Sequence, residues 1–306
     1  MLVLGLLGLW GGTLLAIRGA VLLAEKHGWS QGFVGLTVMS IGTDLPELFI
    51  AVDASVQQLQ GVEASGIIVG NAIGSTMAQA TLVVGAAGLA RYLSVAPSMV
   101  RRDGTTLLLA TLMVVLLGSD GAIDRLEGSV LLIGYALYLI ALSQSRRGQE
   151  ADQPGVRGVL PPSLLVFIGL ATVILASHVS VTEGVALVES WGMSQTMVGV
   201  LILGLGTSLP ELALSVGAAR QGHGSLAVGN AIGSCVFDMM VPLGLAATMH
   251  PLLVGRETLI FDLPALALGS TVLLFFLFRK KGLQRREAWS LLVLYGVYVV
   301  SRTIVG

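Results

Sequence analysis

Charged residues are scarce in this chain, at 11% of its 306 residues, while hydrophobic residues make up 54%. A soluble domain carries about a quarter of charged residues, so this deficit excludes a water-soluble globular protein. The net charge of −1 is uninformative about nucleic acid, but the sequence has no basic patch with interleaved aromatic residues, so we expect no nucleic-acid partner. The single cysteine, Cys235, excludes an internal disulfide, and no His or Cys cluster suggests a zinc, copper or iron site. What remains is an integral membrane protein, with the lipid bilayer as its partner.

Apolar segments of roughly 20 residues, the length that spans a bilayer, follow one another along the chain, and ten can be counted. They run at about 2–23, 31–57, 64–90, 104–118, 127–144, 161–188, 194–219, 225–249, 258–278 and 288–304. The only long polar stretch is 145–158. We therefore expect a five-helix repeat at 1–145, a cytoplasmic linker at 146–160 and a second five-helix repeat at 161–306.

The two halves share sequence. Residues 28–48 align with 192–212 at a constant offset of 164, and 11 of these 21 positions are identical. The motif at 42–48, GTDLPEL, returns at 206–212 as GTSLPEL, and the heptapeptide VGNAIGS occurs at both 69–75 and 228–234. Each copy places a proline and a carboxylate inside an apolar segment. Paired interruptions at matching places in two halves indicate the binding site of a transporter.

The distribution of basic residues predicts the orientation in the membrane. With ten helices the loops alternate sides; Arg125, Arg256 and Arg302 lie on one side, and the other loop Lys and Arg lie on the opposite side. The positive-inside rule then places both termini on the extracytoplasmic side of the cell inner (plasma) membrane. Because five is an odd number, the second half is inverted relative to the first. The expected fold is an all-α polytopic protein of two inverted five-helix repeats, with broken helices at the midplane.

The prolines of the two motifs free backbone carbonyl groups. Pro46 has no N–H to donate to the carbonyl of Gly42. Pro210 leaves the carbonyl of Gly206 without its helical donor in the same way. Such carbonyls at membrane depth are tolerated only where they are buried or line a polar cavity. The motifs therefore predict two polar sites inside the bilayer.

The same motifs supply oxygen-bearing side chains. Thr43 and Glu47 are four residues apart, so they share a helix face, and Thr207 and Glu211 repeat this spacing. Hydroxyl, carbonyl and carboxylate oxygens are the hard ligands that calcium prefers. The inverted repeat is expected to bring the two clusters together near the midplane, as a site for inorganic cations.

This pairing of G-T-[DS]-L-P-E-L with G-N-A-I-G-S in two inverted halves resembles the cation/calcium exchanger superfamily, in particular its short prokaryotic sodium/calcium exchangers. The resemblance covers the whole chain. It implies that helices 2, 3, 7 and 8 surround a four-ion site and that helices 1 and 6 slide to switch access. The ligands that it implies are Glu47 and Glu211 at the centre, with Thr43, Thr207, Ser208, Ser75, Ser234 and Asp238 around them.

Two positions depart from the family pattern. Asp44 stands where the first motif usually has Ser, and Gln79 stands where an Asn is expected. We include both in the predicted site. Asp44 adds a fourth carboxylate to Glu47, Glu211 and Asp238; one calcium ion neutralises two of them, and the rest require sodium, protons or hydrogen bonds.

The sequence therefore predicts a secondary antiporter, not an enzyme, that exchanges Ca²⁺ against Na⁺ by alternating access. The expected transported ions are calcium and sodium, with protons as a further candidate, and no organic cofactor is expected. A calcium/proton or other cation/proton antiporter is the nearest alternative. An intramembrane aspartyl protease would use a carboxylate pair, but it would not call for a mirrored Thr–Pro–Glu signature. We expect a monomer or a weak homo-oligomer.

Overall fold

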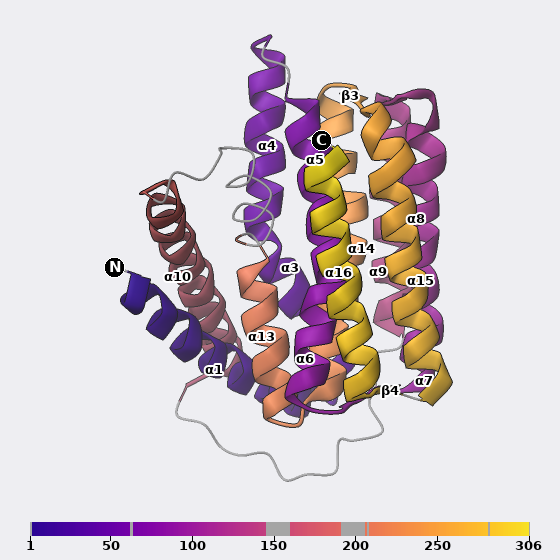
Figure 1. Ribbon diagram of the computed structural model, residues 1–306. Coiled ribbons are helices and arrows are strands. Elements are labelled where there is room, and N and C mark those ends of the chain that lie inside the picture. The colour runs from indigo at the N-terminus through magenta and orange to yellow at the C-terminus, as the bar shows by residue number, and fades with distance from the viewer. Residues whose placement is uncertain are drawn as a thin grey trace.

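Helices make up almost all of the computed structural model, which describes residues 2–61, 64–144, 160–190, 206, 208–280 and 282–305 (Figure 1). In the first half they are α1 (Leu2–His27), α2 (Gln31–Val34), η1 (Gly35–Met39), α3 (Ser40–Thr43), α4 (Leu45–Leu59), α5 (Ser65–Met77), η2 (Ala78–Val83), α6 (Val84–Ala90), α7 (Pro97–Met99), η3 (Val100–Gly104), α8 (Thr105–Leu117), η4 (Gly118–Asp120) and α9 (Arg125–Gln144). In the second half they are α10 (Pro162–Ser190), α13 (Leu209–Arg220), α14 (Gly224–Met249), η6 (Thr258–Asp262), α15 (Leu263–Lys280) and α16 (Arg285–Val305).

Several of these helices join end to end into longer rods that can cross a membrane. Five rods among the described residues are long and apolar enough: 65–90, 97–120, 125–144, 224–249 and 258–279. A sixth forms if residues 31–43 and 45–59, which meet at a 43° bend, count as one broken span. The protein is thus a multi-pass helical membrane protein. Half of the predicted segment 194–219 and most of the predicted linker lie outside the described residues.

The fourth predicted segment is longer than expected. The sequence predicted 104–118, whereas the structure has a continuous rod over 97–120. The charged run from Arg101 to Asp103 ended the apolar pattern, but it is helical here. Asp103 is fully buried because Arg102 donates two hydrogen bonds to its carboxylate, at 2.7 and 2.8 Å. A hydropathy pattern assigns charged residues such as these to a loop. Ion pairing within the helix lowers the cost of burying the charge, so the helix can include them.

Four two-residue strands tie the ends of the rods together. β1 (Leu93–Ser94) pairs antiparallel with β4 (Gly282–Leu283), and β2 (Ala122–Ile123) pairs antiparallel with β3 (Leu252–Leu253). The all-α prediction missed these short pairs. Two of the strands belong to the first half of the chain and two to the second, so each pair joins one half to the other.

The helices α1 and α10 lie side by side, at an angle to the remaining bundle (Figure 1). Small residues allow this close approach. A Cβ added at Gly12 would lie 3.0 Å from the carbonyl oxygen of Gly169, and one at Gly19 would lie 2.6 Å from the backbone nitrogen of Val166. The order of these contacts makes the two helices antiparallel.

The centre of the molecule is α14, which packs on α9, α13, α5 and α4. Its residues from Leu226 to Met240 are all buried. Gly229 and Gly233 let the backbone of the α2–η1 segment lie against it, since a Cβ on either would come within 2.7 Å of an oxygen atom. Several fully buried polar groups, among them Asp44, Glu211 and Asp238, lie where α14 meets the helix breaks.

Candidate cation-binding site

The two GT[DS]LPEL motifs build the same helix break twice. In the first, α3 ends at Thr43, Asp44 takes φ −83° and ψ 3°, and α4 begins at Leu45. In the second, Ser208 takes φ −86° and ψ 6° before α13 begins at Leu209. Each proline lies in the first turn of the new helix, where its missing N–H costs nothing. The prolines therefore start new helices, and each glutamate follows in the first turn.

Three carboxylates meet at these breaks. Asp44, Glu47 and Glu211 are fully buried, and one oxygen of each lies within 4.8 Å of the other two. The carboxyl groups of Asp44 and Glu211 are also within hydrogen-bonding reach of each other. Two sequence motifs from opposite halves of the chain have thus been brought to one point, as the duplicated motif predicted.

Asp238 lies beside this cluster and is held by the first half of the chain. Ser75 Oγ donates a hydrogen bond of 2.6 Å to Asp238 Oδ2, and Gln79 Nε2 donates another of 3.0 Å to the same atom. Gln79 Nε2 also lies 3.5 Å from Asp44 Oδ1. Gln79, one of the two departures from the family pattern, therefore bridges the two acidic groups.

The predicted hydroxyl residues are distributed around the carboxylates. Ser208 and Ser234 are buried, and neither hydroxyl has a hydrogen-bond partner in the part of the chain that the structure describes. Thr43 Oγ1 donates to the backbone carbonyls of Met39 and Ser40, at 3.1 Å each. Thr207, also predicted as a ligand, lies outside the described residues.

Within the described ranges, Asp44, Glu211 and Asp238 have no basic partner. The ion pairs found there join Arg102 to Asp103 and Arg302 to Glu257 and Asp262, all away from the four acids. Several buried oxygens of the site also accept no hydrogen bond from a described hydroxyl or N–H donor: Asp44 Oδ2, Asp238 Oδ1 and Gln79 Oε1. Buried carboxylates need a compensating charge. A site whose available ligand atoms are oxygens fits hard cations such as Ca²⁺ or Na⁺.

Sequence reasoning missed Tyr135 of α9, whose side chain is 8% exposed and whose hydroxyl feels the charges of Asp44 and Asp238. The spacing of Tyr135 and Tyr138 recurs in the second half as Tyr295 and Tyr298, but this repeat by itself does not mark a binding site.

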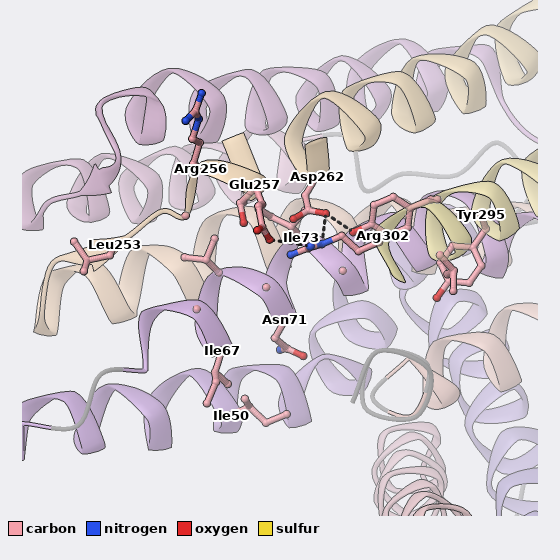
Figure 2. Close-up of a pocket in the computed structure, with 18 residues that line it drawn as sticks. Ile50, Ile67, Asn71, Ile73, Leu253, Arg256, Glu257, Asp262, Tyr295 and Arg302 are labelled. Atoms are coloured by element: carbon pink, nitrogen blue, oxygen red, sulfur yellow. Dashed lines mark hydrogen bonds and ion pairs between the residues drawn. The ribbon is translucent and has the colours of Figure 1, made fainter. Parts of the chain in front are cut away.

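A cavity of about 660 Å³ lies between α5, α16 and the segment that follows β3 (Figure 2). Ile67 and Asn71 of α5 form one wall, and Tyr295 of α16 lies on the other side. Arg302 reaches Glu257 at 3.0 Å and Asp262 at 3.2 Å across it. This cavity shares no residue with the predicted site.

The fold and the site together define a class of protein: a multi-pass helical membrane protein with an oxygen-rich acidic site between broken helices. The sequence profile of the family described as sodium/calcium exchanger protein matches residues 1–144 and 162–304. The chain belongs to this family, which confirms the resemblance inferred from its motifs.

Individual relatives match over most of their length. The sodium/calcium exchanger MaX1 of Methanosarcina acetivorans is 29% identical, over 98% of this chain and 97% of that protein. The putative antiporter CaxA of Alkalimonas amylolytica is 30% identical, over 82% of each. Among solved structures, the sodium-calcium exchanger NCX_Mj soaked with Na⁺ and Ca²⁺ aligns with a TM-score of 0.85 at 27% identity, covering 98% of this chain and 96% of that one.

Proposed function

We propose that this protein exchanges Ca²⁺ against Na⁺ across the membrane as a secondary antiporter, with no chemical step. The observation that carries this proposal is the buried cluster of Asp44, Glu47 and Glu211 with Asp238 beside it; among the described residues, Asp44, Glu211 and Asp238 have no basic partner. Four carboxylates in an apolar interior require cations, protons or hydrogen bonds to compensate their charge. The family and its sodium/calcium exchanger relatives support calcium and sodium as those ions.

The geometry and the motifs support the following ligand set. We assign Glu47, Glu211, Asp44 and Asp238 as charged ligands. The neutral oxygens of the site come from Thr43, Thr207, Ser208, Ser75, Ser234 and Gln79. Calcium takes six to eight oxygen ligands, and a group of this size can serve one calcium ion or several sodium ions. Competition for the shared carboxylates then couples the two fluxes, since calcium binds where sodium has left.

Alternating access requires that the site open to each side in turn. We assign residues 1–145 and 161–306 to two inverted five-helix repeats, joined by a cytoplasmic linker at 146–160. Equivalent features at both ends of the molecule support this assignment. Asp103 in η3 and Asp262 in η6 occupy matching positions in the two halves, and each accepts a hydrogen bond from a tyrosine, Tyr138 or Tyr298. A pseudo-symmetric pair of halves provides two equivalent states, one facing each side.

Within this architecture both termini face the extracytoplasmic side of the plasma membrane, and a single chain holds a complete site. The separately tilted pair of α1 and α10 is the part that we expect to slide across the bundle during the switch. Its interface of glycines and small side chains provides a close-packed, smooth contact.

Calcium uptake into proteoliposomes tests this function directly. Purified protein is reconstituted, and uptake is driven in turn by an outward gradient of sodium, of potassium and of protons. Sodium-driven uptake that is absent in Glu211→Gln and normal in Asp53→Asn, an exposed acid on the same broken span as Asp44, is the expected result. Uptake driven by the proton gradient alone would instead identify a calcium/proton antiporter. No uptake under any of the three gradients would reject calcium transport.

A further inference from the structure

Tyr135 is a buried polar residue in the middle of α9, outside the four helices that the motifs assign to the site. Its side chain is 8% exposed, and its hydroxyl has no hydrogen-bond partner among the residues that the structure describes. A buried hydroxyl is costly to leave unpaired, so such a group requires an explanation.

The surroundings of Tyr135 point toward the carboxylates. Its ring packs edge-on against Phe237 of α14, with centroids 5.6 Å apart, and Phe237 directly precedes Asp238. Burial is the main influence on its hydroxyl, and the carboxylates of Asp44 and Asp238 are the charged groups that also bear on it. Asp44 Oδ2 is itself buried and accepts no hydrogen bond from a described hydroxyl or N–H donor. The Tyr135 hydroxyl is therefore a free donor within the described part of the chain, and Asp44 Oδ2 can accept a hydrogen bond from it.

A second layer of contacts holds Tyr135 in place. Tyr138, one turn further along α9, has its ring centroid 6.2 Å from that of Tyr135. The Tyr138 hydroxyl donates to Asp103 Oδ1 at 3.3 Å, and Arg102 clamps the same carboxylate. This chain of contacts fixes α9 against η3, so that Tyr135 is presented to the site by a rigid element.

The second half contains the same pair of tyrosines in a different electrostatic setting. Tyr295 and Tyr298 repeat the spacing of Tyr135 and Tyr138, and Tyr295 lines the cavity beside α5 (Figure 2). The repeat offsets of 164 and 159 make Ser208 the counterpart of Asp44 and Gln79 the counterpart of Asp238. Both counterparts are neutral. Of the two equivalent residues Tyr135 and Tyr295, only Tyr135 therefore has carboxylates at these two positions.

We propose that Tyr135 is a member of the cation site, supplied by α9, and that its hydroxyl donates a hydrogen bond to the Asp44 carboxylate when the site is loaded. The proposal rests on the proposed function. A hydrogen bond to an ionised carboxylate is about twice as strong as one between neutral groups. One calcium ion neutralises two of the four acids, so a neutral donor beside Asp44 stabilises the negative charge that remains. Tyr135 thus favours the calcium-loaded state.

Calcium titration of the purified protein by calorimetry tests this role. We expect Tyr135→Phe to bind calcium about tenfold more weakly than the unmodified protein, the effect of one hydrogen bond to a charged group. Tyr295→Phe, the same change in the mirror position, should stay within about twofold. If Tyr135→Phe does not fold, Tyr135→Met fills the space with another apolar side chain and replaces it in the test.

A double-mutant cycle with Asp44→Ser separates a direct role from a structural one. In the Asp44→Ser background, Tyr135→Phe should cost less than about threefold, because its acceptor is gone. An equal loss in both backgrounds, or no loss from Tyr135→Phe in the unmodified protein, would overturn the proposal while leaving the antiporter function intact. An unmodified protein that binds no calcium would instead overturn the proposed function, and the role of Tyr135 with it.

Discussion

Ser75 Oγ donates a 2.6 Å hydrogen bond to Asp238 Oδ2, and this contact joins the two halves of the chain. Ser75 ends the first copy of the VGNAIGS heptapeptide, and Asp238 lies one turn after the end of the second. The hydroxyl orients the carboxylate and leaves Asp238 Oδ1 without a described partner. The two copies therefore build one shared site and not two separate ones.

The first prediction concerns the central glutamates. Glu211→Gln keeps the size of a fully buried side chain and removes one negative charge. We expect folded protein with no sodium-driven calcium uptake, because calcium requires carboxylate oxygens that an amide replaces poorly. Uptake in proteoliposomes and thermal unfolding in detergent are the two measurements. Near-normal calcium flux in this variant would contradict the assignment of Glu211 as a cation ligand.

A second prediction concerns the extra acid, Asp44. Removing one carboxylate costs a divalent ion twice the Coulomb energy that it costs a monovalent ion at the same distance. If Asp44→Ser weakens sodium binding about tenfold, calcium binding should therefore weaken about a hundredfold, yet remain measurable through the other three acids. Competitive titrations give both affinities. Asp53→Ser, which removes an exposed acid that accepts a hydrogen bond from Gln57, is the matched control. Equal factors for the two ions would exclude a direct role of Asp44.

A third prediction concerns the close packing of α14. A Cβ at Gly233 would lie 2.7 Å from Ser40 Oγ and 2.8 Å from the carbonyl oxygen of Leu36. Gly233→Ala should destabilise the protein by ~1–3 kcal/mol, the typical cost of overpacking. Gly296→Ala in α16 meets no atom within 4 Å and should cost nothing. Thermal unfolding in detergent compares them, and an equal midpoint for both variants would contradict such tight packing at Gly233.

A fourth prediction concerns His223, in the turn before α14. Burial lowers the pKa of His223, partly opposed by the Glu25 carboxylate, and its Nδ1 lies 3.0 Å from Gln31 Oε1. A lowered pKa means that the unfolded chain binds the proton more readily. The contribution of neutral His223 is therefore complete above about pH 6.5 and is lost as the pH falls through the lower folded value.

The expected loss is under about 1 kcal/mol, because His223 is only half-buried and solvent screens its charge. Unfolding midpoints measured from neutral to mildly acidic pH should fall less in His223→Gln than in the unmodified protein. If the unfolding midpoint of His223→Gln depends on pH as steeply as that of the unmodified protein, His223 does not contribute to the pH dependence of stability.

A fifth prediction concerns orientation. A cysteine at residue 306, in a chain whose buried Cys235 is first replaced by Ala, should react with a membrane-impermeant maleimide in intact cells. A cysteine in the linker at residue 150 should react only after lysis. The reverse pattern would contradict the five-plus-five layout that places both termini outside.

Much of this site could be predicted from the sequence because its residues belong to short motifs that occur in both halves. A proline beside a glutamate in an apolar segment is informative without any structure, and its duplication indicates that two such points meet. The same reasoning could not find Tyr135, since a tyrosine in an apolar helix has no distinctive local pattern. Nor could it anticipate that the charged run at Arg101–Asp103 is helical, because that depends on the pairing of Arg102 with its neighbour.

Composition and periodicity alone establish the membrane class, the duplicated motifs and the acids at the helix breaks, since they carry that information directly. Which oxygens share the site emerges from the folded chain. Gln79 lies between Asp44 and Asp238, and Ser75 binds Asp238 and not an acid of its own half. Such contacts depend on how α5, α9 and α14 pack, because glycines such as Gly233 set the separation of helices to fractions of an ångström.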